Sequence, residues 1–156
     1  RNTNRMLGER KKISESTLKQ LKEVTDESVS VHFFTGEEEL DEAADLLGEL
    51  EKIRLLDERG HLDFVNEIRW TEKENVEKRD GVDIKTIDLN NTEKVGLEIS
   101  RDPEVIGLIR KWNGGNAFKK LTRNSINAAG AVGILSIKKT DRHAYIHGGR
   151  MVERLW

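Results

Sequence analysis

The sequence predicts an α/β fold in which helices flank a mixed β-sheet. Three observations predict it. A long stretch with apolar residues three and four apart begins near residue 37, segments with alternating apolar residues follow, and the nearly continuous apolar run AVGILSI occupies residues 131–137. Such a run is typical of a strand covered on both faces in a mixed or parallel sheet. The predicted order is helix, strand, strand, strand, helix, strand, which gives an αβββαβ core.

Helices are predicted from capping residues and from the 3.6-residue period of apolar positions. Thr35 is the expected N-cap of the longest helix, with Glu38 as its capping-box partner. The predicted helices cover residues 14–24, 35–60, 103–112 and 116–130.

Strands are predicted where β-branched and aromatic residues gather, or where apolar and polar residues alternate. The segment LDFVNEIRW alternates in this way and predicts a half-buried strand. Asn90-Asn91 predicts a tight turn between two further strands, because asparagine tolerates left-handed backbone geometry. The predicted strands cover residues 28–34, 62–70, 82–89, 94–100 and 131–137, with an edge strand at 144–147.

With 156 residues, the chain is long enough for one hydrophobic core. We expect a single domain over residues 13–156, preceded by a polar, flexible segment at residues 1–12. The chain begins with Arg1 rather than Met, which predicts a fragment or a processed product. No apolar stretch has the length of a bilayer span, so no membrane partner is expected. The absence of cysteine excludes disulfides and thiolate metal sites and fits a cytoplasmic, nuclear or otherwise intracellular protein.

Charge is segregated along the chain although the net charge is only −2. Residues 25–100 hold 9 basic and 22 acidic residues, whereas residues 101–156 hold 11 basic and 4 acidic residues. A metal-binding core with phosphate-gripping flanks would show this pattern. Solvated helix faces beside a basic tail would show it too, and on charge alone that interpretation is the simpler one. The cations predicted to grip phosphates without reading sequence are Lys119, Lys120, Arg123, Lys138 and Lys139.

Three acidic residues are predicted to lie near one end of the sheet. Asp83 and Glu98 fall on adjacent predicted strands, and Glu67 falls on the strand before them. Carboxylates placed so close repel one another unless a cation neutralises them. Oxygen ligands suit Mg²⁺ or Mn²⁺, which can place a water for attack on phosphorus. Acids at alternate strand positions are also ordinary on a sheet face that meets water, and both interpretations stay open.

The stretch GVDIKTID…VGLEIS…NAFKKLTRNSINAAGAVGILSIKK resembles the core of the PD-(D/E)xK nuclease superfamily, and within it BamHI-like type II restriction endonucleases. The resemblance covers about residues 36–139. It implies a restriction-endonuclease-like fold and metal-dependent hydrolysis of nucleic acid, with DNA as the expected substrate. It makes Asp83 and Glu98 the metal ligands and Glu67 an extra acid on the preceding strand. Cutting both strands of a duplex would call for a homodimer.

One position departs from the superfamily pattern. Ser100 stands two residues after the second acid, where a lysine is usual. Lys85 lies two residues after Asp83, on the same face of the predicted strand, and would supply the missing positive charge. Asp83-Ile84-Lys85 can also be interpreted as the D-x-K element itself, with Asp63 as the earlier acid.

The sequence therefore predicts two functions. The first is a Mg²⁺-dependent or Mn²⁺-dependent endonuclease. The alternative, which Ser100 favours, is a catalytically inactive module of the same fold that binds nucleic acid or a protein partner through its basic C-terminal third. The residues predicted to carry catalysis are Glu67, Asp83, Lys85, Glu98 and Ser100.

Overall fold

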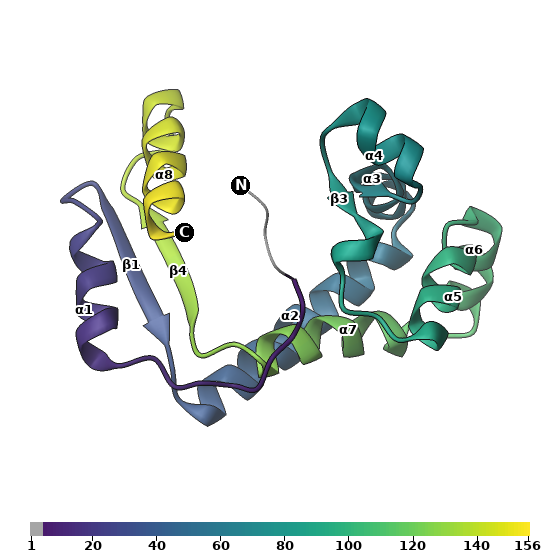
Figure 1. Cartoon of the computed structure of the whole chain (residues 1–156), viewed down its shortest axis with the longest axis horizontal. Helices are drawn as coiled ribbons and strands as arrows, with labels where there is room; N and C mark the ends of the chain where they lie inside the picture. Colours follow the sequence, from purple (N-terminus) through teal and green to yellow (C-terminus); the bar gives the residue numbers. More distant parts are fainter. Residues whose placement is uncertain (1–4) are drawn as a thin grey trace. The chain divides into compact units, whose positions relative to one another are not determined.

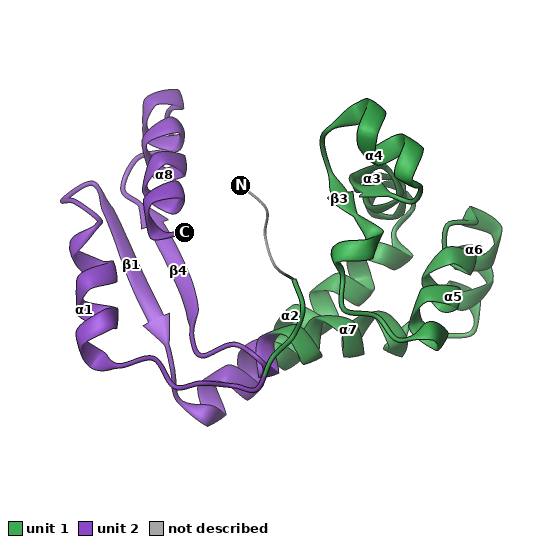
Figure 2. Cartoon of the chain, in the orientation of Figure 1, with its two compact units in different colours: residues 1–8, 44–125 green, residues 9–43, 126–156 purple. Residues whose placement is uncertain are grey.

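The structure is a computed structural model that describes residues 5–156, and it has a mixed α/β composition in which helices predominate (Figure 1). The chain divides into two compact units: unit 1 comprises residues 1–8 and 44–125, and unit 2 comprises residues 9–43 and 126–156 (Figure 2). The single domain over residues 13–156 that the sequence predicts stays a prediction.

Unit 2 is built on a two-stranded antiparallel sheet. Strand β1 (Val29–Phe34) pairs with strand β4 (Val132–Ile137), so that Val29 lies opposite Ile137 and Phe34 opposite Val132. Helix α1 (Glu15–Glu23) packs against β1, and helix α8 (Arg142–Leu155) packs against β4. Two segments that are about a hundred residues apart in the sequence thereby form one small layered unit.

A glycine allows α8 to lie close to β4. A Cβ atom on Gly148 would lie 2.9 Å from Cγ2 of Ile137, closer than real carbon atoms approach. Gly148 and the neighbouring Met151 are both buried against this part of the unit. The helix begins after Asp141, whose carboxylate accepts a hydrogen bond from the Ala144 backbone N–H at 2.9 Å.

Unit 1 is mainly helical. It contains the part of helix α2 (Glu37–Leu56) from Ala44 onward and a short parallel pair of strands, β2 (Ile68–Arg69) and β3 (Val82–Asp83). A 3₁₀ turn, η1 (Ile84–Thr86), follows β3. The other helices of the unit are α3 (Glu58–Glu67), α4 (Glu72–Lys78), α5 (Asn91–Ile99), α6 (Pro103–Lys111) and α7 (Asn116–Asn127).

Phe64 connects two groups of buried residues in the core of unit 1. It packs against one cluster formed by Leu55, Ile106 and Phe118, and against a second formed by Ile68, Leu89 and Leu97. Its ring also meets the Trp70 ring edge to face, with centroids 6.2 Å apart. One side chain of α3 therefore links the helices α2, α6 and α7 to the segment around β2 and α5.

Several predicted elements are confirmed. The strands predicted at 28–34 and 131–137 correspond to β1 and β4, and the helices predicted at 14–24, 103–112 and 116–130 correspond to α1, α6 and α7. The long helix is also present, but it ends at Leu56, and Asp57 caps a separate helix. The prediction of Glu38 as the capping partner is wrong, because Glu39 accepts the hydrogen bonds from the Thr35 and Gly36 backbone N–H groups.

The strand predicted at residues 62–70 is wrong: most of this segment is α3, and only Ile68 and Arg69 are extended. The buried or half-buried positions 61, 64, 65 and 68 recur at intervals of three and four, which is the helical period. The Asp57 carboxylate starts this helix by accepting hydrogen bonds from two backbone N–H groups, both at 3.0 Å. The Asp57 cap therefore favours a helix here, although the short alternating pattern predicts a strand.

The strands predicted at residues 82–89 and 94–100 are wrong as well. The first forms a strand at Val82–Asp83, a 3₁₀ turn and an isolated bridge at Ile87, and the second lies in α5. Asn90 is the N-cap of α5 and forms a reciprocal capping box with Glu93, so it is not a hairpin turn. Leu97 is buried whereas Val95 and Ile99 are more than half exposed, an arrangement that a strand with period two cannot produce.

The C-terminal edge strand predicted at 144–147 is also wrong, because α8 covers these residues. Within residues 5–156, the sheets are the β1–β4 pair and the β2–β3 pair. The structure thus supports the α/β class and does not confirm the αβββαβ core of a restriction-endonuclease-like fold. No helix in the described part of the chain has the length and apolar character needed to cross a membrane.

The adjacent glycines of α8 generate a matched prediction. Gly148→Leu should destabilise the protein by about 1–3 kcal/mol, because the new side chain has no room against Ile137. Gly149→Ala should stabilise it by up to about 1 kcal/mol, because alanine favours a helix and nothing lies within 4 Å of the new methyl group. Urea unfolding of both variants measures these changes in the free energy of unfolding. Equal effects of the two changes would contradict the packing of α8 on β4.

Candidate functional site

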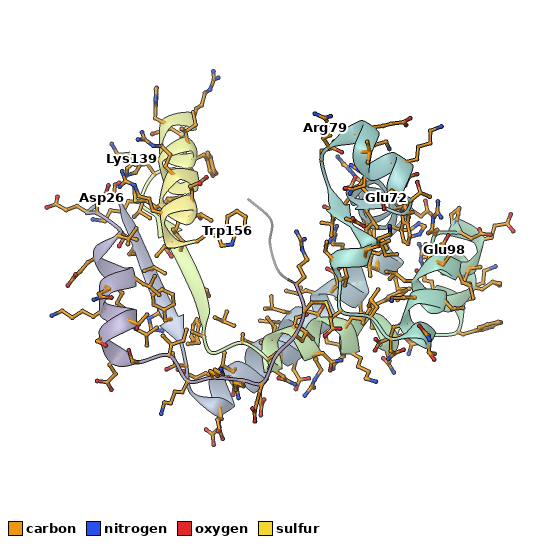
Figure 3. The ribbon with its side chains drawn as sticks, viewed as in Figure 1. Asp26, Glu72, Arg79, Glu98, Lys139 and Trp156 are labelled. Atoms are coloured by element: carbon orange, nitrogen blue, oxygen red, sulfur yellow. The ribbon has the colours of Figure 1, made fainter. Side chains whose placement is uncertain are left out.

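The end of the β1–β4 pair beside the start of α8 carries a cavity of about 470 Å³ in unit 2. We call it the β4–α8 pocket. Figure 3 shows Asp26 and Lys139 at this same end of the unit. The residues that line the pocket are Glu27, Ser28, Val29, Ile137, Lys138, Lys139, Asp141, His143, Ala144 and His147.

Two acidic residues at or beside this pocket, Asp26 and Asp141, are engaged in local hydrogen bonds. Asp26 accepts hydrogen bonds from the Ser28 backbone N–H at 2.9 Å and from the Ser28 hydroxyl at 2.7 Å. Its second oxygen contacts Nε2 of His147 at 2.6 Å. The hydrogen bonds from Ser28, together with the one from His147, hold the pKa of the Asp26 carboxyl well below its ordinary value. Asp141 is the cap of α8, as described above.

The basic groups that follow β4 are not neutralised in this way. Residues 138–156 contain five lysines and arginines and two acidic residues. Within residues 5–156, none of these five cations forms an ion pair with an acidic side chain. The five cations, which we call the basic track, are Lys138, Lys139, Arg142, Arg150 and Arg154.

The cations of α7 are in a different electrostatic state. Nζ of Lys119 lies 2.7 Å from a Glu49 carboxylate oxygen and 3.5 Å from Asp45, and Arg123 also pairs with Asp45. Glu49 correspondingly raises the pKa of the Lys119 ammonium group. Lys120 is exposed and has no such ion pair in the described residues. Of the five cations predicted to bind phosphates, Lys119 and Arg123 are thus occupied by α2, whereas Lys138 and Lys139 line the β4–α8 pocket.

The acids predicted to share a metal ion are engaged with separate partners in unit 1. Asp83 accepts hydrogen bonds from the Asn75 side chain at 3.0 Å and from the Lys85 backbone N–H at 2.9 Å. Glu98 lies on α5 and pairs with Arg101, and Glu67, the last residue of α3, pairs with Arg54 at 2.7 Å. In the described part of the chain, no three acidic or histidine side chains gather in a group that could hold a metal ion. Each of the three predicted ligands thus has a partner of its own, and the shared Mg²⁺ or Mn²⁺ site stays a prediction.

The other two predicted catalytic residues also have structural contacts. The Lys85 ammonium group pairs with Glu72, which raises its pKa. Ser100 is only 2% exposed, and its hydroxyl donates to the Leu97 carbonyl at 2.8 Å. Figure 3 shows Glu72 and Glu98 on different helices of unit 1.

Two buried polar residues of unit 1 were missed by sequence reasoning. Arg69, assigned to the polar face of a predicted strand, is only 6% exposed, and its guanidinium group reaches Asp80 at 2.7 Å and the Asn66 carbonyl at 2.6 Å. His61 is also buried, and its Nε2 lies 2.8 Å from the Ser100 carbonyl oxygen. The one sequence signal for the Arg69–Asp80 contact is the turn pair Asp80-Gly81. Gly81 adopts a φ of 67° in this turn.

The comparisons with known proteins leave the function open. The chain is 25% identical, over 130 residues, to uncharacterized protein MT1398 of Mycobacterium tuberculosis (strain CDC 1551 / Oshkosh). The match covers 83% of this chain and 18% of that protein, so the chain spans less than a fifth of its relative's length. No model of a known protein family matches the chain, and no solved structure matches it.

The low pKa of Asp26 predicts a pH-dependent contribution to stability. A carboxylate whose pKa is depressed by folding stabilises the protein above its unfolded pKa of about 4, and this contribution disappears as the pH falls through the folded value. The difference in unfolding midpoint between the wild type and Asp26→Asn should therefore shrink as the pH is lowered from about 5 to about 2.

Thermal unfolding monitored by circular dichroism at several pH values measures this difference. Asp41→Asn is the matched control, because Asp41 is exposed on α2 and its side chain forms no hydrogen bond or ion pair within the described residues. A midpoint difference that stays constant over this pH range would show that the Asp26 charge does not stabilise the fold.

Proposed function

We propose that the chain is a non-enzymatic module that binds the phosphate backbone of nucleic acid through the basic track. The observation that carries this proposal is the contrast between two sets of cations. Lys119 and Arg123 of α7 are neutralised by acids of α2, whereas none of the five cations after β4 pairs with an acidic side chain within residues 5–156. Unpaired lysines and arginines attract phosphate groups and release condensed counterions on binding.

The local structure supports anion binding at the β4–α8 pocket. Lys138 and Lys139 are exposed there, and His143 lies beside them. The pocket also adjoins the N-terminus of α8, a helix of 14 residues whose dipole favours negative charge at this end. Contacts of this type position a nucleic-acid backbone without reading its sequence. We therefore infer that the module binds where phosphate groups are closely spaced and does not select a particular base sequence.

Metal-dependent cleavage, and the restriction-endonuclease-like core that would carry it, stay predictions from the sequence. The binding module is the better supported proposal, because all five predicted catalytic residues already make structural contacts. Asp83 begins a 3₁₀ turn and Ser100 is buried, and the charged groups of Glu67, Lys85 and Glu98 are each paired with an opposite charge. A shared metal ion would have to displace several of these contacts.

The proposal predicts that the two lysines of the β4–α8 pocket contribute to nucleic-acid affinity. Lys138→Ala combined with Lys139→Ala should weaken binding to single-stranded and double-stranded oligonucleotides. It should also make the affinity less dependent on salt: the slope of log Kd against log salt concentration should fall by about two. Fluorescence anisotropy over a series of salt concentrations measures both effects.

The matched control combines Lys78→Ala with Lys94→Ala, which removes two exposed lysines of unit 1. We expect this control to leave most of the affinity and of the salt dependence intact. If the wild type binds no oligonucleotide at low salt, or if both double variants lose affinity equally, the basic track is not the binding surface.

A second prediction separates the binding module from the nuclease. We expect DNA and RNA to remain uncut whether Mg²⁺, Mn²⁺ or EDTA is present, and Mn²⁺ not to raise the unfolding temperature, because a competent metal site would stabilise the folded chain. Gel assays and thermal unfolding measure these outcomes. Cleavage that requires Mg²⁺ and is abolished by Asp83→Asn and by Glu98→Gln would establish the nuclease instead.

A further inference from the structure

Helix α8 covers one face of the β1–β4 sheet. A Cβ atom on Gly148 would lie 2.9 Å from Ile137 and 3.9 Å from Leu135, so the helix packs on the face from which these two side chains project. The antiparallel register places Val29 opposite Ile137 and Val31 opposite Leu135, on the same face. Val29 is only 2% exposed and Val31 is half-buried, as expected for a covered face.

The opposite face of this sheet is open over its middle. Side chains alternate between the two faces of a sheet, so every second residue of each strand belongs to this face. Ile134 is 53% exposed here, and Ser30, His32 and Ser136 are exposed as well. Within residues 5–156, nothing therefore covers the middle of this face. We call it the open face, and its residues are Ser30, His32, Phe34, Val132, Ile134 and Ser136.

A ring and apolar side chains lie together on the open face. His32 is opposite Ile134 in the ladder of the two strands. The His32 ring also meets the Phe34 ring edge to face, with centroids 4.6 Å apart and an angle of 72° between the ring planes. Phe34 and Val132, which lie opposite each other, are half-buried. An exposed ring beside apolar side chains is a surface on which a nucleic-acid base can stack.

Hydroxyl groups and one cation lie at the other end of the open face. Ser30 is opposite Ser136, and neither hydroxyl forms a hydrogen bond within residues 5–156. The ladder continues past β4, because the Lys138 backbone N–H donates to the Ser28 carbonyl at 3.1 Å. Lys138 therefore follows Ser136 in the alternation, and its side chain leaves the sheet on the open face. Residues on one face of a strand are about 7 Å apart, so this cation and these hydroxyls lie within one or two such steps of His32.

We propose that the open face binds single-stranded nucleic acid. This inference rests on the proposed function, because Lys138 belongs to the basic track that binds the phosphate backbone. One base stacks on His32 beside Ile134, and a neighbouring phosphate meets Lys138 and the two serine hydroxyls. The bases of a duplex are paired and stacked on one another, so a duplex cannot place a base on this face. Single strands therefore gain a contact that duplexes lack.

The chemistry of the open face favours a nucleic acid over a protein segment as its occupant. Lys138 gives the face a positive charge, and none of the six residues of the face is acidic. An apolar helix or sheet packed on the face would take Lys138 and the serine hydroxyls out of water without giving them a partner, which is costly. A nucleotide carries an anionic phosphate beside a flat base. It therefore supplies an acceptor for the polar end of the face and a stacking partner for His32.

Three probes test whether bases contribute to binding by the full chain: a single-stranded oligonucleotide, an abasic strand of the same length, and a duplex. The abasic strand carries the same phosphates and no bases. We expect the base-bearing strand to bind at least about tenfold more tightly than the abasic strand, as measured by fluorescence anisotropy. It should also bind more tightly than the duplex at high salt, where phosphate contacts weaken and stacking remains.

The outcomes separate this inference from the proposed function. Equal affinity for the base-bearing and abasic strands, or tighter binding of the duplex at high salt, would overturn the inference and leave phosphate binding intact. A chain that binds none of the three probes would overturn both proposals.

Substitutions of His32 test the stacking contact itself. His32→Ala should raise the dissociation constant of the base-bearing strand about tenfold and leave that of the abasic strand unchanged, because it removes the stacking ring. His32→Phe should restore the affinity, because an uncharged aromatic ring can still stack. Tyr145→Ala is the matched control, since Tyr145 is a 60% exposed ring on α8, which lies on the covered side of the sheet. Equal losses in His32→Ala and Tyr145→Ala, or a His32→Phe variant as weak as His32→Ala, would overturn base stacking on the open face.

The ring-proton resonances of His32 report the contact directly. A base stacked on the ring shifts these resonances upfield in a nuclear magnetic resonance titration, whereas a bound phosphate alone does not. We expect the upfield shift with the base-bearing strand and not with the abasic strand. His32 resonances that stay unchanged while the base-bearing strand is bound would show that its bases lie away from the open face.

Discussion

The pairing of β1 with β4 is the interaction on which unit 2 depends. It joins segments that are about a hundred residues apart in the sequence, so its formation carries a large loop-closure entropy that packing around the strands must offset. Gly148 contributes to this packing because the absence of a side chain lets α8 approach Ile137 closely. The same pairing brings Asp26 and Ser28, before β1, next to Lys138 and His147, which follow β4. Without it, the β4–α8 pocket would not exist.

Charge pairing differs between helix α7 and the segment after β4. In unit 1, acids of α2 and α3 pair with cations of the same unit, including Arg54, Lys119 and Arg123. Exposed pairs of this kind add little stability each, but they remove the positive charge that would attract a phosphate. In unit 2, two of the acids near the cations are held by hydrogen bonds from Ser28 and from the first turn of α8. Within residues 5–156, none of the five cations after β4 forms an ion pair with an acidic side chain.

The resemblance to a nuclease core depended on strands that the structure shows as helices. Glu98 was placed beside Asp83 on the assumption that residues 94–100 are extended, and the Asn90–Glu93 capping box makes them helical. Residues 62–70 showed the same ambiguity, since a short segment with five apolar residues fits both periods. The predictions at β1 and β4 were correct because β-branched and aromatic residues dominate those segments, so that local propensity and burial agree.

The sequence by itself determined the helical segments with strong caps, the strands with a consistent β composition, and the excess of basic residues in the last third of the chain. These are local properties, set by hydrogen bonds and side chains within a few residues of one another. Only the tertiary structure decided which cations are neutralised, because Lys119 meets Glu49 across 70 residues of sequence. It also decided that Arg69 is buried and that β4 pairs with β1, because both follow from contacts between distant segments, which no local pattern encodes.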